Sequence, residues 1–386
     1  MTAQLGLGTY RCTDVERAAA MAAAHAGDWI DTAPNYHRGL AEDALCQVLG
    51  HNPQVKVSTK VGFVPRLLCG SAVKDGVLTE AEAESGYSLA PEYVAWQVEC
   101  SRRGLGRTPD LVFLHNPEHH CEPHQIRERL YTAFAALEEA CAGGHIHGYG
   151  VATWNGFSSG AFNVPLLLDL ATKAGGPHHH LRAIQLPLSL VKLGAIAEAL
   201  DGGGVLAEAQ VAGLDVFASA PLHGGEVPKL VTPELAELIR PGSSPAQAGL
   251  AVVASAPGSA VCTAVDRSRG TLDRRCRHRG PAAAVGYRDA KGRRCTRYLN
   301  RKSPIGCAGL MPRRPASFRP SQLAPASPGA GTAEPWDVWW QRRSATAGSG
   351  WPARRSRRPR ASSGKARWPP SCRCSRTCRG PACAVG

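Results

Sequence analysis

Four residues whose side chains can carry or stabilise a proton each follow a short apolar segment. Asp31 and Tyr36 come after one predicted strand, Lys60 ends the next, and His115 ends a third. In a barrel of parallel strands, the carboxyl ends of all strands meet at one rim, where active sites are built. The sequence therefore predicts a proton-transfer site that contains an aspartate, a tyrosine, a lysine and a histidine.

A tyrosine is a suitable proton donor for such a site, but its ordinary pKa of about 10 makes it a weak acid at neutral pH. A nearby ammonium group lowers that pKa by favouring the phenolate, and a carboxylate keeps the ammonium charged and in place. Tyr36, Lys60 and Asp31 supply these parts. Each residue alone could be a loop cap, a surface aromatic or a solvated charge, but their recurrence at strand ends favours a shared site.

The chain around these residues alternates between strand-like and helix-like patterns. Strands are expected at residues 5–9, 29–30, 55–60, 110–115, 146–152, 183–186 and 215–218, with an eighth at 261–265. Helices are expected at residues 15–26, 40–49, 91–103, 123–142, 164–174, 190–200 and 244–254. This alternation is typical of a parallel α/β architecture. No G-x-G-x-x-G follows the first strand, which favours a closed barrel over a doubly wound sheet.

Two details of this pattern concern the rim and its surroundings. Residues 61–90 are longer than a usual connection, so we expect an irregular loop that overhangs the rim and shapes the substrate pocket. In the helix at 40–49, apolar residues recur at helical spacing, and Glu42 and Asp43 are expected to face outward.

Four short motifs, taken in order, resemble those of the aldo-keto reductases. They are Leu5-Gly6-Leu7-Gly8-Thr9, Asp31-Thr32-Ala33 followed by Tyr36, Ser58-Thr59-Lys60, and Phe113-Leu114-His115. The resemblance covers residues 5–258 and implies a (β/α)8 TIM barrel that reduces aldehydes, ketones or sugar-like carbonyls with NADPH, or alternatively NADH. It implies that Tyr36 is the general acid, that Lys60 tunes it and that Asp31 pairs with Lys60. His115 would hydrogen-bond the substrate oxygen.

The same resemblance implies where the cofactor binds. Gln185 stands at the position that holds the nicotinamide carboxamide, and Ala152 and Thr153 replace a serine and an asparagine that usually share this task. Leu188 stands where an aromatic residue usually packs on the nicotinamide. A loop resembling the pyrophosphate clasp follows the strand at 215–218, and the glycines of the first strand let a ligand approach its backbone. The predicted cofactor-binding residues are Gly8, Thr9, Thr153, Gln185, Leu188, Ala220, Leu222 and Gly224.

The composition changes abruptly near residue 259. From there to residue 386 the chain has 28 Lys+Arg and 5 Asp+Glu, whereas the residues before have 17 and 26. We therefore expect a barrel at residues 1–265, whose last β/α unit is incomplete, and a low-complexity Arg/Pro/Ser/Cys-rich tail at 266–386. That tail lacks apolar periodicity, so we expect it to be disordered or to derive from an out-of-frame reading. Its arginines would bind phosphate backbones without specificity, so no specific nucleic-acid partner is expected.

The remaining features indicate a cytoplasmic monomer that acts on a small-molecule carbonyl substrate. The sequence has no secretory signal and no apolar run of the roughly 20 residues that a membrane helix needs. The six cysteines before residue 259 have no metal-ligand spacing, and the histidine-rich run at 115–124 is better explained as a polar rim loop than as a metal site. The alternative is a catalytically impaired nucleotide-binding barrel with a regulatory or binding role.

Overall fold

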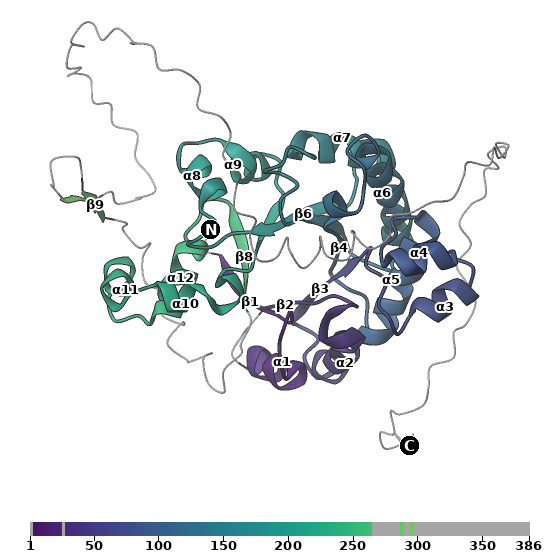
Figure 1. Cartoon of the computed structure of the whole chain (residues 1–386), viewed down its shortest axis with the longest axis horizontal. Coiled ribbons are helices and arrows are strands. Elements are labelled where there is room, and N and C mark those ends of the chain that lie inside the picture. Colours follow the sequence, from purple (N-terminus) through teal and green to yellow (C-terminus); the bar gives the residue numbers. More distant parts are fainter. Residues whose placement is uncertain (1–2, 25–27, 265–285, 289–293, 297–386) are drawn as a thin grey trace, which may run out of the picture. The chain divides into compact units, whose positions relative to one another are not determined.

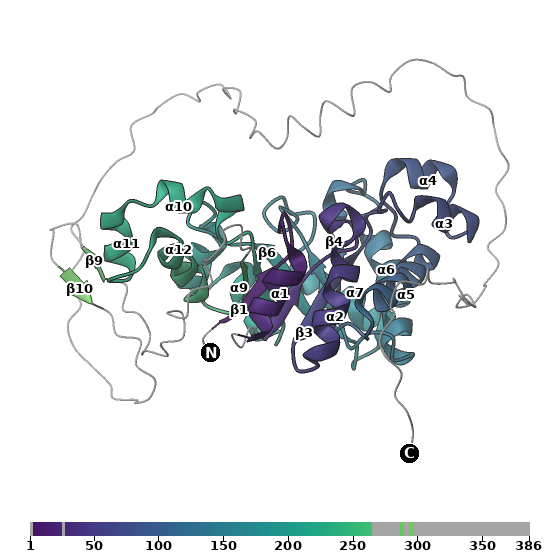
Figure 2. The same cartoon turned by 90° about the horizontal axis from the view of Figure 1, so that it is seen from below.

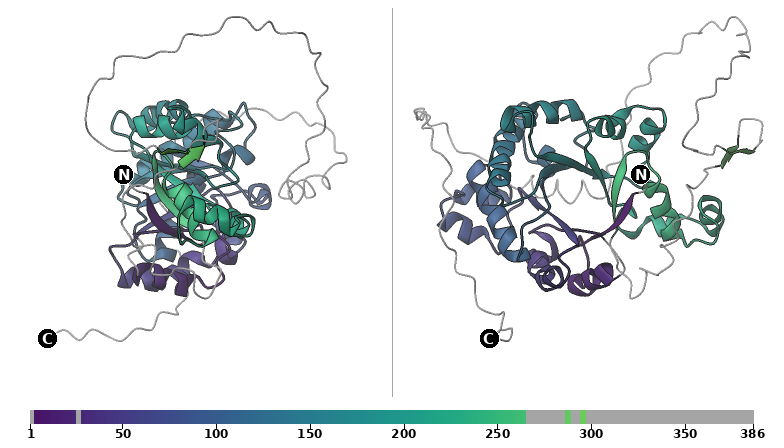
Figure 3. Two further views of the ribbon diagram at one scale, coloured as in Figure 1. Left: turned by 90° about the vertical axis from the view of Figure 1, so that its left-hand side faces the viewer. Right: turned by 180° about the vertical axis from the view of Figure 1, so that it is seen from behind.

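The structure is a computed structural model that describes residues 3–24, 28–264, 286–288 and 294–296. Eight parallel strands pair in chain order, and the sheet closes into a barrel because β1 also pairs with β8. Figure 1 and the right-hand view of Figure 3 show helices around this ring of strands. The (β/α)8 barrel predicted from the sequence is thus confirmed. The strands are β1 (Gln4–Gly8), β2 (Trp29–Asp31), β3 (Lys56–Val61), β4 (Leu111–His115), β5 (Tyr149–Ala152), β6 (Leu181–Pro187), β7 (Asp215–Ser219) and β8 (Ser259–Ala264).

The predicted helices are present, with ends shifted by a few residues. They are α1 (Val15–Ala24), α2 (Ala41–His51), α5 (Pro91–Leu105), α6 (Ile126–Ala142), α7 (Val164–Gly175), α8 (Gly194–Leu200) and α12 (Pro245–Ala254). Local sequence explains several of their starts. Ser244 caps α12 in a reciprocal capping box with Gln247, and Asn163 accepts a hydrogen bond from the backbone N–H of Leu166 at the start of α7. The N-terminus of a helix leaves such donors free, so these side chains fix where each helix begins.

Further short helices lie in the connections, where none was predicted. Residues 61–90 form the long connection that was expected, but they contain α3 (Cys69–Lys74) and α4 (Glu80–Ser85), which were not predicted. The other short helices are α9 (Gly204–Val211), α10 (Val227–Leu230) and α11 (Pro233–Ile239), and the single turns are η1 (Tyr36–Gly39), η2 (Pro117–His119) and η3 (His223–Gly225). Figure 2 shows α3 and α4 at one end of the upper side of the barrel and α10 and α11 at the other. Helices of this length have few apolar repeats, which is why periodicity does not reveal them.

Apolar side chains pack in two layers around the strands. Inside the barrel, the rings of Trp29 and Phe113 both lie edge-on to Phe217. Between the strands and the helices, a larger cluster contains Val112 and Leu114 of β4. Because successive strand residues face opposite sides, β4 contributes to both layers in turn. The barrel therefore has a filled interior, and polar groups that stay buried need partners within it.

The strand register places the predicted site residues at one edge. Asp31 of β2 is paired with Ser58 of β3, and Lys60 lies two residues further along β3. Lys60 is in turn paired with Phe113 of β4. His115 is paired with Ala152, which is in turn paired with Gln185. The carboxyl ends of β2 to β6 therefore meet at the same rim of the barrel.

The chain beyond β8 lies mostly outside the described residues. The eighth strand, expected at 261–265, is confirmed as β8, which pairs with both β1 and β7. In the predicted tail, 266–386, the structure describes β9 (Gly286–Arg288) and β10 (Arg294–Thr296), which pair antiparallel. The expected disorder of the tail and the expected incompleteness of the last β/α unit concern residues outside the described part of the chain. Within the described part of the chain, no helix combines the length and the apolarity needed to span a membrane.

Candidate active site

Asp31 and Lys60 form a buried ion pair at the rim. The Nζ atom of Lys60 lies 2.7 Å from Oδ2 of Asp31, and the two side chains are only 2% and 8% exposed. Lys60 also donates a hydrogen bond of 2.8 Å to the backbone carbonyl of Thr32. A buried ammonium group is tolerated only where it is paired and hydrogen-bonded. Both conditions are met here, so the lysine is held in one place.

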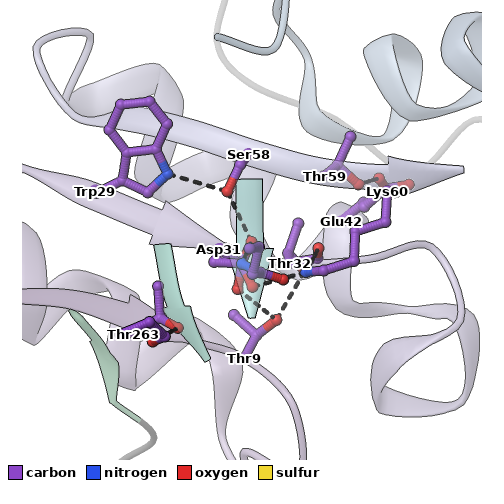
Figure 4. A network of polar contacts seen from close by, with 11 residues as sticks. Thr9, Trp29, Asp31, Thr32, Glu42, Ser58, Thr59, Lys60 and Thr263 are labelled. Atoms are coloured by element: carbon purple, nitrogen blue, oxygen red, sulfur yellow. Dashed lines mark hydrogen bonds and ion pairs between the residues drawn. The ribbon is translucent and has the colours of Figure 1, made fainter. Parts of the chain in front are cut away.

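The second carboxylate oxygen of Asp31 is held by two side chains that donate to it. Oδ1 accepts hydrogen bonds from Oγ of Ser58 at 2.8 Å and from Nε2 of Gln185 at 3.1 Å. Ser58 in turn accepts a hydrogen bond of 3.0 Å from the indole Nε1 of Trp29 inside the barrel. Figure 4 shows this chain from Trp29 through Ser58 to Asp31 and on to Lys60. Ser58 and Trp29 were not predicted as site residues, although Ser58 lies on the same face of β3 as Lys60.

Tyr36 lies between the lysine and the histidine. Nζ of Lys60 is 5.0 Å from the centre of the Tyr36 ring, and the Tyr36 and His115 rings meet edge to face with centres 5.9 Å apart. On its other side, the ring of Tyr36 lies 5.1 Å from that of Tyr10. The structure therefore brings together all four residues that were predicted to transfer the proton.

The environment shifts the pKa of three of these groups. Burial lowers the pKa of Lys60, and the charge of Asp31 opposes that shift. Burial, followed by the charge of Lys60, holds the pKa of His115 well below its ordinary value, which leaves the imidazole neutral at pH 7. Burial, with the charge of Asp31, raises the pKa of Tyr36 well above 10. The lowering of this pKa that was expected from Lys60 does not occur, because Asp31 pairs with the ammonium and the phenol is desolvated.

A second buried carboxyl group lies next to this site. Glu42, on the first turn of α2, is 8% exposed and accepts a hydrogen bond from the hydroxyl of Thr59. The expectation that Glu42 faces outward is therefore wrong. The cause is α5, where Gly104 lies so close that a Cβ atom there would be 3.2 Å from Cβ of Glu42. Burial raises the pKa of Glu42 to about 7, and hydrogen bonds and the charge of Lys60 act against this shift.

The predicted carboxamide residues already have hydrogen-bond partners. Gln185, 3% exposed, donates to Asp31 as described. The hydroxyl of Thr153 donates to Oε1 of Glu118 at 2.6 Å and accepts from the backbone N–H of Gly156 at 2.7 Å. Thr153 and Gln185 are joined directly, because the backbone N–H of Thr153 donates to the carbonyl of Gln185 at 2.8 Å. These two residues thus lie side by side at the rim.

The other predicted cofactor-binding residues lie around the same rim. Gly8 pairs with Asp31 in the sheet, and Thr9 donates a hydrogen bond of 2.8 Å to the hydroxyl of Thr32. Leu188 is fully buried in the cluster between strands and helices, so it has a packing role, and its contact with a nicotinamide stays a prediction. Ala220, Leu222 and Gly224 form a loop in which Ala220 and Gly224 have φ of 48° and 65°. Such positive φ values turn the loop sharply after β7.

The histidine-rich run after β4 has structural contacts. His119 contacts Oδ1 of Asn155 at 3.0 Å, and His120 stacks on the ring of Tyr87 with centres 4.1 Å apart. Phe63 lies edge-on to both His115 and His120. Within the described residues, no group of three or more His, Cys, Asp or Glu side chains is arranged to hold a metal ion.

The chain forms a closed (β/α)8 barrel with a buried Asp-Lys pair, a tyrosine and a histidine at its carboxyl rim, which is where barrel enzymes have their active sites. The model of the aldo/keto reductase family matches residues 2–231, which is more than half of the chain. The chain therefore belongs to the aldo/keto reductase family, which is a family of oxidoreductases. No curated protein matches the chain.

Solved structures of similar fold are also aldo-keto reductases. A thermostable aldo-keto reductase in complex with the inhibitor epalrestat is 18% identical, with 70% of this chain and 86% of that chain covered and a TM-score of 0.49. An aldo-keto reductase from Klebsiella pneumoniae in complex with NADPH is 21% identical, with 68% and 81% covered and a TM-score of 0.46. The holo form of an aldo-keto reductase from Bacillus halodurans is 18% identical, with 69% and 83% covered and a TM-score of 0.48.

Proposed function

We propose that the chain reduces aldehydes, ketones or sugar-like carbonyls with NADPH, or alternatively with NADH, and that Tyr36 is the general acid. The observation that carries this proposal is the buried Asp31–Lys60 pair, whose ammonium nitrogen lies 5.0 Å from the centre of the Tyr36 ring. We place the catalytic unit in residues 1–265. Membership of the aldo/keto reductase family supports the reaction class.

In this proposal Tyr36 holds the proton until the substrate needs it. Tyr36 is protonated across the neutral range, and because burial raises its pKa further, it releases the proton only when charge develops on the substrate oxygen. A bound reduced nicotinamide supplies the hydride, and negative charge then develops on the substrate oxygen. Tyr36 donates its proton to that oxygen, and the ammonium of Lys60 stabilises the phenolate that remains. The pairing with Asp31 keeps Lys60 in place through this step.

His115 has a different role, because its imidazole is neutral. The lowered pKa of His115 leaves one ring nitrogen protonated and the other free. A neutral imidazole can donate one hydrogen bond to the substrate carbonyl without competing with Tyr36 as a proton source. Phe63 and Tyr36 contact the His115 ring edge-on and limit its orientation.

The residues at the rim fit the nicotinamide half of the cofactor. Gln185 and Thr153 are adjacent, and beside them the oxygen Oε2 of Glu118 is buried without a hydrogen-bond partner among the described residues. A buried acceptor without a donor suits a ligand that brings N–H groups. The loop that contains Ala220, Leu222 and Gly224 would contact the phosphates through its backbone. The proposal assigns no residue to the adenosine half of the cofactor.

The experiment is steady-state oxidation of NADPH by the full chain with a panel of simple aldehydes and ketones. The Tyr36→Phe variant should lose about 10²–10⁴-fold in rate, which is the usual contribution of general acid catalysis. Tyr131→Phe removes the same hydroxyl from an exposed position on α6 and serves as the matched control. Equal activity of Tyr36→Phe and wild type would remove Tyr36 from the mechanism.

A second candidate function is a nucleotide-binding barrel without turnover. The observation that favours it is the rim of β5, where Ala152 and Thr153 replace the usual Ser-Asn pair and the Thr153 hydroxyl is committed to Glu118. Tight binding of NADPH in a fluorescence titration, together with no oxidation on any carbonyl tested, would support this alternative. Binding together with turnover would support the reductase.

A further inference from the structure

Glu118 is a buried carboxylate at the rim that no predicted role includes. It lies on η2, three residues after His115, where Asn116 has φ of 51° and Pro117 starts the turn. The Glu118 side chain is only 3% exposed. A carboxylate is rarely buried to this degree unless each oxygen has partners.

One oxygen of Glu118 has partners and the other has none. Oε1 accepts from the Thr153 hydroxyl at 2.6 Å and from the backbone N–H groups of Trp154 and Asn155 at 2.9 and 3.1 Å. His119 also approaches Oε1, with its Nε2 at 3.6 Å. Oε2 is buried and has no hydrogen-bond partner among the residues that the structure describes. The carboxylate therefore ties the loop after β4 to the loop after β5 and keeps one acceptor free.

The position of this acceptor indicates what it would bind. Thr153 bonds Oε1 through its hydroxyl and the carbonyl of Gln185 through its backbone N–H, so it connects Glu118 to the second residue predicted to hold the carboxamide. The Thr153 hydroxyl donates to Glu118, and the amide of Gln185 donates to Asp31. These side-chain donors are thus committed within the protein. A primary carboxamide brings two N–H donors of its own, which is the complement that a free carboxylate oxygen requires.

We propose that Oε2 of Glu118 accepts a hydrogen bond from the carboxamide N–H of the bound nicotinamide, in place of the usual Ser-Asn pair. This inference rests on the proposed function, because it requires that a nicotinamide binds at the rim. It adds a residue from the loop after β4 to the predicted cofactor site. A hydroxyl group of the substrate is an alternative donor to Oε2, and binding measurements separate the two.

The test measures binding and not activity. Dissociation constants of the full chain are determined by fluorescence titration for the reduced cofactor and for its reduced 3-acetylpyridine analogue, which has a methyl group where the carboxamide has its NH2. The wild type should bind the natural cofactor about 10- to 100-fold more tightly, which is the range expected for one hydrogen bond to a charged group. In Glu118→Ala this ratio should fall to about 1.

Disturbance of the two loops by the Glu118→Ala substitution would weaken both ligands alike and leave their ratio unchanged. If circular dichroism shows that Glu118→Ala does not fold, Glu118→Gln keeps one neutral acceptor of the same size and should give an intermediate ratio. An unchanged ratio in the folded variant would overturn the proposal, and a raised KM for a hydroxylated aldehyde at an unchanged ratio would assign Oε2 to the substrate. Failure of the wild type to bind either cofactor would instead refute the proposed function.

Discussion

The ammonium nitrogen of Lys60 lies 2.7 Å from Asp31, which is the same distance that separates Lys173 from Asp169 on the surface of α7. The two pairs differ in exposure. The side chains of Lys60 and Asp31 are 2% and 8% exposed, whereas those of Lys173 and Asp169 are 55% and 45% exposed. Water screens the surface pair, so its net contribution is small. In the buried pair each charge depends on the other, because neither is solvated.

The Asp31→Asn variant should therefore be strongly destabilised. Removing one partner of a buried ion pair costs about 3–5 kcal/mol, because the remaining charge stays buried without compensation. Urea unfolding of the full chain measures this free energy. Asp169→Asn is the matched control and should change the free energy of unfolding by less than about 1 kcal/mol. A similar loss in the two variants would mean that Lys60 is better solvated than the structure indicates.

Ser58 is expected to support both stability and catalysis through Asp31. In Ser58→Ala, Asp31 loses one donor and the buried indole N–H of Trp29 loses its acceptor. A buried donor that is left without an acceptor lowers the free energy of unfolding by about 1–3 kcal/mol. The free energy of unfolding should fall by that amount, and kcat should fall with little change in KM. Ser158→Ala, at an exposed position, serves as the control. An unaltered kcat would show that Gln185 alone is enough to hold Asp31.

The sequence predicts the ends of the strands well, because each apolar run stops at a polar residue that the rim needs. Asp31, Lys60 and His115 were found in this way, and Tyr36 followed from its motif. The bond from Ser58 to Asp31 depends on which residues of β2 and β3 lie opposite each other. Register of this kind is a property of the pair of strands and is not visible in either strand alone.

The errors at Glu42 and at residues 61–90 have different causes. Periodicity treats α2 as a helix with one apolar side, whereas α5 covers part of its polar side at Gly104. In residues 61–90, Thr79 and Glu82 form a capping box that starts α4, and this local signal was available in the sequence. The charges on Asp31 and Lys60 were predicted, but the net rise in the pKa of Tyr36 depends on burial, which only the packed structure defines.

Stability is expected to depend on pH through Glu42. The pKa of Glu42 is about 7 in the folded protein, whereas the ordinary value for a glutamate is 4.5. The folded protein therefore binds this proton more tightly than the unfolded chain does. The contribution of the protonated carboxyl is therefore fully present below about pH 4.5 and is lost as the pH rises towards 7. The shift corresponds to roughly 3 kcal/mol. Because Glu42→Gln stays neutral, its free energy of unfolding relative to wild type should increase from pH 5 to pH 8. A difference that stays constant over that range would contradict the raised pKa.

Gly62, directly after β3, is expected to tolerate no side chain. Its φ is +122°, and a Cβ atom there would lie 2.7 Å from Cε2 and 2.9 Å from the hydroxyl of Tyr87. Tyr87 is buried and stacked on His120, so its ring has little freedom to move away.

Gly76 offers a matched control, because it has φ of +73° and nothing lies within 4 Å of a Cβ atom placed on it. Gly76→Ala should cost only the backbone strain of about 1–2 kcal/mol. Gly62→Ala should lose at least about 2 kcal/mol more in urea unfolding, because overpacking adds to the strain. Equal losses of stability in the two variants would show that the Tyr87 ring can move aside despite its stacking on His120.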